Sequence, residues 1–112
     1  MGTNDAVFIT GEVYRGCAEI FGQHLHDVYL YGSYARGDFD NESDVDILLT
    51  VDMNQKAISL RRNAVAHLSS SLSLEHDVTV SITVVPLEQF TRFSEVLPYY
   101  RNVFREGIRY AV

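Results

Sequence analysis

The stretch that decides the fold is Val28–Val51, which reads VYLYGSYARGDFDNESDVDILLTV. It opens with a short apolar run, Val28–Tyr31, of the kind that forms a buried strand. The run breaks at Gly32-Ser33, where glycine permits a tight turn. A polar loop rich in turn formers then leads to a second apolar run, Val45–Val51. These features predict two strands on either side of a turn and a loop.

The turn between these strands has the features of an anion-binding site. Ser33 follows the turn and can cap a helix, whose first backbone N–H groups have no partner within the helix. Gly32 lets a ligand approach the backbone closely. Phosphate is the anion that such an arrangement most often binds.

Two carboxylates lie at the start of the second strand. Asp44 and Asp46 are two residues apart, so in an extended chain they point to the same face. Two negative charges that close repel each other, and keeping both ionised requires a cation. Paired carboxylate oxygens suit Mg²⁺ or Mn²⁺. The sequence therefore predicts a divalent metal site beside the anion site.

Each signal has a plainer interpretation when it stands alone. A single Asp-X-Asp is usually a solvated strand entry, and a single Gly-Ser is usually an ordinary turn. Here Gly32-Ser33 is followed by ten residues and then by Asp44-Val-Asp46, with Arg36 and Ser43 in between. This pattern resembles the polymerase-beta-type nucleotidyltransferase superfamily, and most closely its small stand-alone members, the minimal nucleotidyltransferases.

The resemblance implies a Mg²⁺-dependent transfer of a nucleoside monophosphate from a triphosphate, with ATP as the expected substrate. It implies a nucleotide-binding set and a pair of carboxylates that hold two Mg²⁺ ions. The nucleotide-binding residues are Gly32, Ser33, Arg36 and Ser43, and the metal-binding and catalytic pair is Asp44 and Asp46. An acceptor hydroxyl would attack the α-phosphorus, and pyrophosphate would leave.

Members of this superfamily carry a third carboxylate on a later strand. The β-branched run from Asp77 to about Val85 predicts that strand, with Asp77, Ser81 and Thr83 among the residues on one face. Counting back from Pro86 places the expected carboxylate near Ser81, whereas the acid on this face is Asp77. Either Asp77 is the third catalytic and metal-binding acid, or the site has only two carboxylates.

The rest of the chain reads as alternating helices and strands. Helices are predicted from Thr3 or Asn4 to Phe21, from Gln55 to Leu72 with a closing turn at Ser69–Ser73, and from Leu97 or Pro98 to Ile108. Together with the strands they predict an α/β (α+β) fold, with a small mixed sheet of about three core strands flanked by helices. We expect one nucleotidyltransferase domain over residues 1–112.

The composition narrows the choice of partners. Nine Lys and Arg residues against 15 Asp and Glu give a net charge of −6, which argues against strong nucleic-acid binding. The single cysteine, Cys17, falls in the apolar pattern of the first helix and is expected in the core. The chain has no apolar run of membrane-spanning length and no signal-peptide pattern, so we expect a cytoplasmic protein without a membrane partner.

The sequence says less about the molecule that accepts the nucleoside monophosphate than about the reaction itself. Minimal members of the resembled family often act as antitoxins in toxin-antitoxin systems, transferring AMP to a tyrosine of a HEPN-type toxin. This adenylyltransferase role is the leading hypothesis. A catalytically weak or inactive domain that acts on its partner by contact alone is the alternative, and transfer to a small molecule or an RNA end is a third. The exposed strand edges and an apolar helix face also allow a homodimer.

Overall fold

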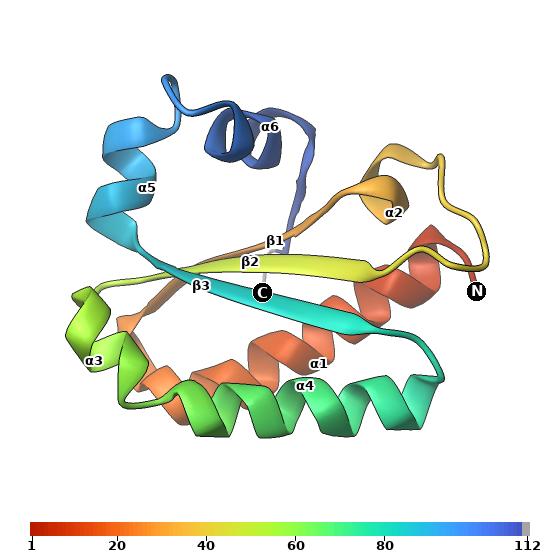
Figure 1. Ribbon diagram of the computed structural model, residues 1–112, viewed down its shortest axis with the longest axis horizontal. Helices are drawn as coiled ribbons and strands as arrows, with labels where there is room; N and C mark the ends of the chain where they lie inside the picture. The colour runs from red at the N-terminus through yellow and green to blue at the C-terminus, as the bar shows by residue number, and fades with distance from the viewer. Residues whose placement is uncertain (111–112) are drawn as a thin grey trace.

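The computed structural model describes residues 1–110, in which a four-stranded mixed sheet has helices on both faces (Figure 1). The strands are β1 (Leu25–Tyr31), β2 (Val45–Val51), β3 (Val80–Pro86) and β4 (Ile108–Arg109), in the order β3-β2-β1-β4. β2 pairs antiparallel with β1 and parallel with β3, and β4 pairs antiparallel with β1. The predicted mixed α/β sheet is confirmed, and the two-residue β4 is an addition that the sequence did not indicate.

The larger core lies between the sheet and two long helices. α1 (Thr3–Phe21) and α4 (Arg62–His76) run beneath the sheet in Figure 1. A parallel pair of strands needs a crossover connection, and α3 (Gln55–Ser59) with α4 supplies the one between β2 and β3. The central side chains of this core are almost fully buried and include Ile9, Val13, Cys17, Leu30, Ile47 and Leu49.

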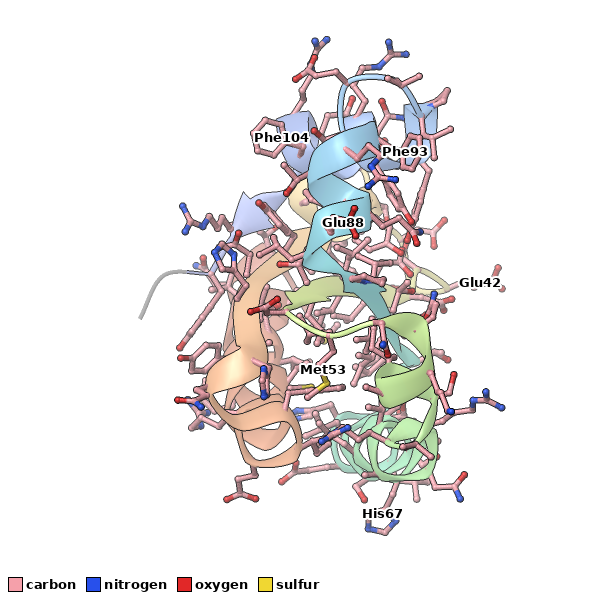
Figure 2. All side chains as sticks on the ribbon, turned by 90° about the vertical axis from the view of Figure 1, so that its left-hand side faces the viewer. Glu42, Met53, His67, Glu88, Phe93 and Phe104 are labelled. Atoms are coloured by element: carbon pink, nitrogen blue, oxygen red, sulfur yellow. The ribbon has the colours of Figure 1, made fainter. Side chains whose placement is uncertain are left out.

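The opposite face of the sheet carries shorter helices. α5 (Leu87–Phe93) and α6 (Pro98–Glu106) lie above it, and α2 (Ser33–Arg36) follows the end of β1 (Figure 1). Figure 2 shows Phe93 and Phe104 at this end of the molecule, far from His67 of α4. A second, smaller core fills the space under α5 and α6 and consists of Tyr29, Leu48, Val85, Phe90, Tyr100 and Val103.

The first predicted helix is confirmed. The last one begins at Pro98 as predicted but ends at Glu106, since Ile108 belongs to β4, and the middle one differs more. The predicted helix 55–72 is two helices, α3 and α4, because the chain bends at Leu60-Arg61, where the side chain of Leu60 is 79% exposed. The closing turn predicted at Ser69–Ser73 is wrong, since α4 continues to His76.

Two serines of α4, Ser69 and Ser73, have hydroxyl groups that are hydrogen bonded. Ser69 donates its hydroxyl to the carbonyl of Val80 at 2.5 Å, and the Ser73 hydroxyl donates to the carbonyl of Ser69 at 2.7 Å. The Ser73 hydroxyl also accepts the backbone N–H of Val80 at 2.9 Å. These bonds fasten the first residue of β3 to α4, so the serines anchor a strand instead of ending a helix.

The third strand begins later than predicted. Asp77 has a left-handed backbone conformation (φ 52°, ψ 46°) and ends α4, so the expected start of the strand at Asp77 is wrong. β3 starts at Val80, and its register places Val80 beside Val45 and Ser81 beside Asp46.

Two smaller expectations can also be checked. Cys17 is fully buried, and burial raises the pKa of its thiol to about 12, which agrees with a core residue and not a reactive nucleophile. By the same reasoning Phe8, another apolar residue of the first predicted helix, is expected to face the core, but it is 61% exposed. Within residues 1–110, every helix is too short or too polar to cross a bilayer.

Candidate functional site

The sheet register gathers the candidate site into one row of residues. Asp46 on β2 is the backbone partner of Tyr31 on β1 and of Ser81 on β3. Side chains directly opposite in neighbouring strands share a face, and residues two apart do the same, so the next row on this face holds Tyr29, Leu48 and Thr83. Tyr29 and Leu48 belong to the small core under α5 and α6. The row therefore lies on the face of α5 and α6, at the end of the sheet next to α2.

Asp44 and Asp46 are brought together, as the sequence predicts. Asp44 is exposed, whereas Asp46 is partly buried at the second position of β2. Burial, and then the nearby charge of Asp44, raise the pKa of Asp46, and the guanidinium of Arg36 opposes this shift. The two carboxylates thus form an under-compensated anionic pair. Their oxygen atoms are the donors that Mg²⁺ prefers, so the chemistry of this pair fits that ion.

Gly32 places the turn directly against this pair. Its φ of +76° and ψ of −156° belong to a region that is essentially limited to glycine. A Cβ added at Gly32 would lie 2.5 Å from Oδ2 of Asp46, a distance that no real side chain tolerates. The absence of a side chain is what allows the turn and the carboxylate to lie this close.

The turn also presents backbone donors. The hydrogen bonds that open α2 run from the N–H groups of Ala35 and Arg36 to the carbonyl of Gly32, each at 3.1 Å. The N–H groups of Ser33 and Tyr34 precede these bonds, as expected for the first residues of a helix. Tyr34 is buried, with its ring stacked on that of Phe39 at 4.6 Å between centroids, which fixes the short helix on the core. The geometry thus places donors for an anion next to the carboxylate pair.

The other two predicted nucleotide-binding residues take part in local contacts. Nε of Arg36 donates to Oδ2 of Asp38 at 3.2 Å, on the exposed surface near Gly32. The Ser43 hydroxyl accepts the N–H of Asp40 at 2.9 Å and donates to Oδ1 of Asp40 at 3.3 Å. Ser43 therefore closes the loop before β2, which positions Asp44.

A cavity of about 220 Å³ opens beside the turn, between α2 and α6. Gly32, Arg36 and Tyr31 line one side, and Tyr99 and Asn102 of α6 belong to the other. Sequence reasoning missed the residues from α6. No local signal marks them, because only the folding of α5 and α6 back over the sheet brings them to the turn.

The structure does not bring Asp77 to the carboxylate pair. Asp77 lies three residues before β3 and lines a separate cavity with Tyr34, Phe39 and Asn41. Ser81, the other position considered, is the direct neighbour of Asp46. On β3 the residue beside Asp46 therefore carries a hydroxyl group and not a carboxylate.

A second group of possible metal ligands has a structural explanation. The side-chain ligand atoms of Glu12, Glu75 and His76 lie within 4.8 Å of one another. Nε2 of His76 lies 2.6 Å from Oε1 of Glu12, so the pair joins α4 to α1. These residues belong to the helices on the opposite face of the sheet, and they do not extend the site around Asp46.

Comparison with known proteins points to one family. A family model described as a nucleotidyltransferase domain matches residues 12–110. A protein of Methanocaldococcus jannaschii, named as a protein adenylyltransferase on a provisional basis, is 30% identical over 86% of this chain and 95% of its own.

Solved structures agree with the fold. A structure provisionally described as a minimal nucleotidyltransferase is 23% identical over 96% of this chain and 95% of its own, with a TM-score of 0.59. A toxin-antitoxin structure with AMP-PNP is 17% identical over 89% of this chain and 70% of its own, with a TM-score of 0.55. At these identities the likeness concerns the fold alone.

The contact between Gly32 and Asp46 predicts unequal effects of two alanine substitutions. Gly37 also has a positive φ (+91°), but a Cβ there would meet nothing within 4 Å. Gly37→Ala should lower the free energy of unfolding by about 1–2 kcal/mol, the usual cost of a left-handed non-glycine residue. Gly32→Ala should lower it further, because the new methyl group also collides with Asp46. Urea unfolding measures both, and equal losses would contradict the contact.

The raised pKa of Asp46 predicts that this carboxylate destabilises the metal-free fold at neutral pH. With the pKa above its ordinary value of 3.8, the folded chain binds the proton more tightly than the unfolded chain. The free energy of unfolding therefore falls as pH rises between the two pKa values. Asp46→Asn should be more stable than the wild type at pH 7 in EDTA, and this advantage should shrink toward pH 4.

Urea unfolding at several pH values tests this expectation. Asp52→Asn is the matched control, since Asp52 is an exposed carboxylate just beyond the other end of β2. A gain in Asp46→Asn that does not change with pH, or that Asp52→Asn reproduces, would show that ionisation of Asp46 is not its source.

Proposed function

The chain belongs to the nucleotidyltransferase domain family, and from this premise we propose that it transfers AMP from ATP to a tyrosine hydroxyl of a HEPN-type toxin, as an antitoxin. The observation that carries the proposal is the closeness of Gly32 to Asp46, which combines an anion-binding turn with a carboxylate pair. The provisional name of the M. jannaschii relative supports transfer to a protein, and the toxin-antitoxin structure with AMP-PNP supports a toxin partner and a nucleotide.

Each residue of the site has a part in this reaction. The backbone at Gly32-Ser33 binds the β- and γ-phosphates, and Arg36, which lines the adjacent cavity, offsets triphosphate charge. Asp44 and Asp46 would hold Mg²⁺, which stabilises the charge on the entering and leaving oxygens when bound. Ser43 contributes by fixing the loop that presents Asp44. The acceptor oxygen bonds to the α-phosphorus, the bond from that phosphorus to the β-phosphate oxygen breaks, pyrophosphate leaves, and the proton of the acceptor hydroxyl passes to solvent.

The hydroxyl at Ser81 favours a phenol as the acceptor. A third carboxylate next to Asp46 would help remove the proton of the attacking hydroxyl, and serine cannot do this at neutral pH. Tyrosine has a pKa of about 10, so it releases its proton more readily than an aliphatic hydroxyl does. A site with two carboxylates is therefore better suited to tyrosine than to serine, threonine or ribose.

The same observation supports a second candidate function. With a hydroxyl in the position of the third acid, the domain would have little catalytic power and would neutralise its partner by contact. The two functions differ in what the carboxylates are for. An enzyme needs Asp44 and Asp46, whereas a contact protein tolerates their replacement.

Replacing either carboxylate of the pair should abolish transfer. With purified chain, partner toxin, Mg²⁺ and ATP labelled at the α-phosphate, Asp44→Asn and Asp46→Asn should each reduce labelling of the toxin by at least 100-fold. Asp77→Asn is the matched control and should leave labelling unchanged, because Asp77 lies outside β3 and lines another cavity.

Cell growth separates the two candidate functions. Cells that express the toxin should be protected by the wild-type chain and not by the Asp44→Asn, Asp46→Asn double variant. Protection by the double variant would identify the contact function. Labelling that survives in both single variants would overturn the transferase proposal, and labelling that is lost in Asp77→Asn would restore Asp77 as the third acid.

An acid at position 81 should accelerate transfer. Ser81→Asp places a carboxylate beside Asp46, in the position expected to assist proton removal, and should raise the transfer rate by about tenfold or more. Thr79→Asp is the control, since it adds the same charge at an exposed position before the strand. Initial rates at saturating ATP provide the measurement. A rate that is unchanged or lower in a folded Ser81→Asp would show that a third acid is not what limits this site.

A further inference from the structure

Two tyrosine hydroxyl groups meet at the cavity beside the site. The hydroxyl oxygens of Tyr31 and Tyr99 are 2.8 Å apart, and their rings pack edge to face at 5.7 Å between centroids. Tyr31 ends β1 directly opposite Asp46, and Tyr99 comes from α6. Both residues line the cavity of about 220 Å³ together with Gly32 and Arg36. One cavity is thus lined both by residues proposed to bind the triphosphate and by two phenol side chains.

The two phenols differ in their freedom to react. Tyr31 is partly buried and packs against the small core that contains Tyr29 and Leu48. Burial raises its pKa, as do Tyr99 and Asp46, while Thr83 lowers it. Tyr99 is 44% exposed and lies in the first turn of α6. Of the two, Tyr99 can turn its hydroxyl toward a bound nucleotide without disrupting the sheet.

From this arrangement we infer that Tyr99 is an internal acceptor, so that the protein transfers a nucleoside monophosphate to its own Tyr99. The inference rests on the proposed function, because it uses the same phosphate and carboxylate sites. The phenol oxygen of Tyr99 bonds to the α-phosphorus of a nucleoside triphosphate. The bond from that phosphorus to the β-phosphate oxygen breaks, pyrophosphate leaves, and the phenol proton passes to solvent at the open side of the cavity.

The chemistry of the site agrees with this acceptor. The hydroxyl at Ser81 favours a phenol, and Tyr99 is a phenol already held next to Gly32 and Arg36. Holding the acceptor in place removes much of the entropic cost of bringing two molecules together. In the absence of a partner, Tyr99 is therefore an exposed phenol that is already held beside the site. Once modified, it would leave a nucleotide in the cavity and slow transfer to the partner.

Intact-mass measurement of the purified chain after incubation with ATP and Mg²⁺ tests the inference. The expected result is a gain of one AMP per chain, which peptide mapping assigns to Tyr99. The gain should be lost in Tyr99→Phe and in Asp46→Asn. It should persist in Tyr14→Phe, a matched control whose tyrosine packs against Tyr110, outside the cavity. The modified fraction at a given time should not change over a hundredfold dilution, since the reaction is intramolecular.

The outcomes separate this inference from the proposed function. Modification of another residue, or modification that survives Tyr99→Phe, would overturn the inference. So would a modified fraction that falls in proportion to protein concentration. If the chain labels its partner toxin but never itself, the inference fails and the proposed function stands. If it labels neither, both fail.

Discussion

The pairing of β2 with a strand on each side is the constraint on which the site depends. An antiparallel neighbour places Tyr31 beside Asp46, and a parallel neighbour places Ser81 on the other side. Because side chains alternate across a strand, a slip of one residue in β2 would turn Asp46 into the apolar core between the sheet and α1. The same slip would remove Ile47 and Leu49, which are fully buried, from that core. The core that stabilises the fold therefore also fixes the face on which the carboxylate lies.

The register of β3 depends in turn on α4. Parallel strands cannot be joined by a tight turn that would set their register, so the register of β3 depends on the crossover helix. Ser69 and Ser73 do this by bonding the backbone of Val80 on both its carbonyl and its N–H group. With Val80 fixed, Ser81 falls beside Asp46. The identity of the third residue in the row is thus decided by two hydroxyl groups on a helix that lies on the other face of the sheet.

The sequence predicted the elements whose signals are local. The two-residue period of a strand predicted that Asp44 and Asp46 share a face. The closeness of Gly32 to Asp46 also depends on the antiparallel pairing of β1 with β2. The boundary at Asp77 could not be predicted, since a β-branched run does not show that Asp77 adopts a left-handed conformation and ends a helix. The turn predicted at Ser69–Ser73 was wrong for a similar reason. The sequence does not show that hydroxyl groups in this run bond the backbone of β3. Tyr99 reaches the cavity through the packing of α5 and α6, for which the sequence near Gly32 carries no information.

Residues of the candidate site lower the stability of the fold. Fixing Gly32 in its conformation costs more backbone entropy on folding than fixing another residue would. Asp46 is held partly buried beside Asp44, and its pKa is raised. In an acidic chain of net charge −6, Arg36 is the cation that lowers the pKa of Asp46, and it is exposed. One exposed guanidinium compensates this pair weakly, because water screens it. The residual negative charge repels a free anion, and it would be offset if, as we propose, a triphosphate binds together with divalent cations. The excess of carboxylate at the site is thus the charge that the proposed metal would compensate.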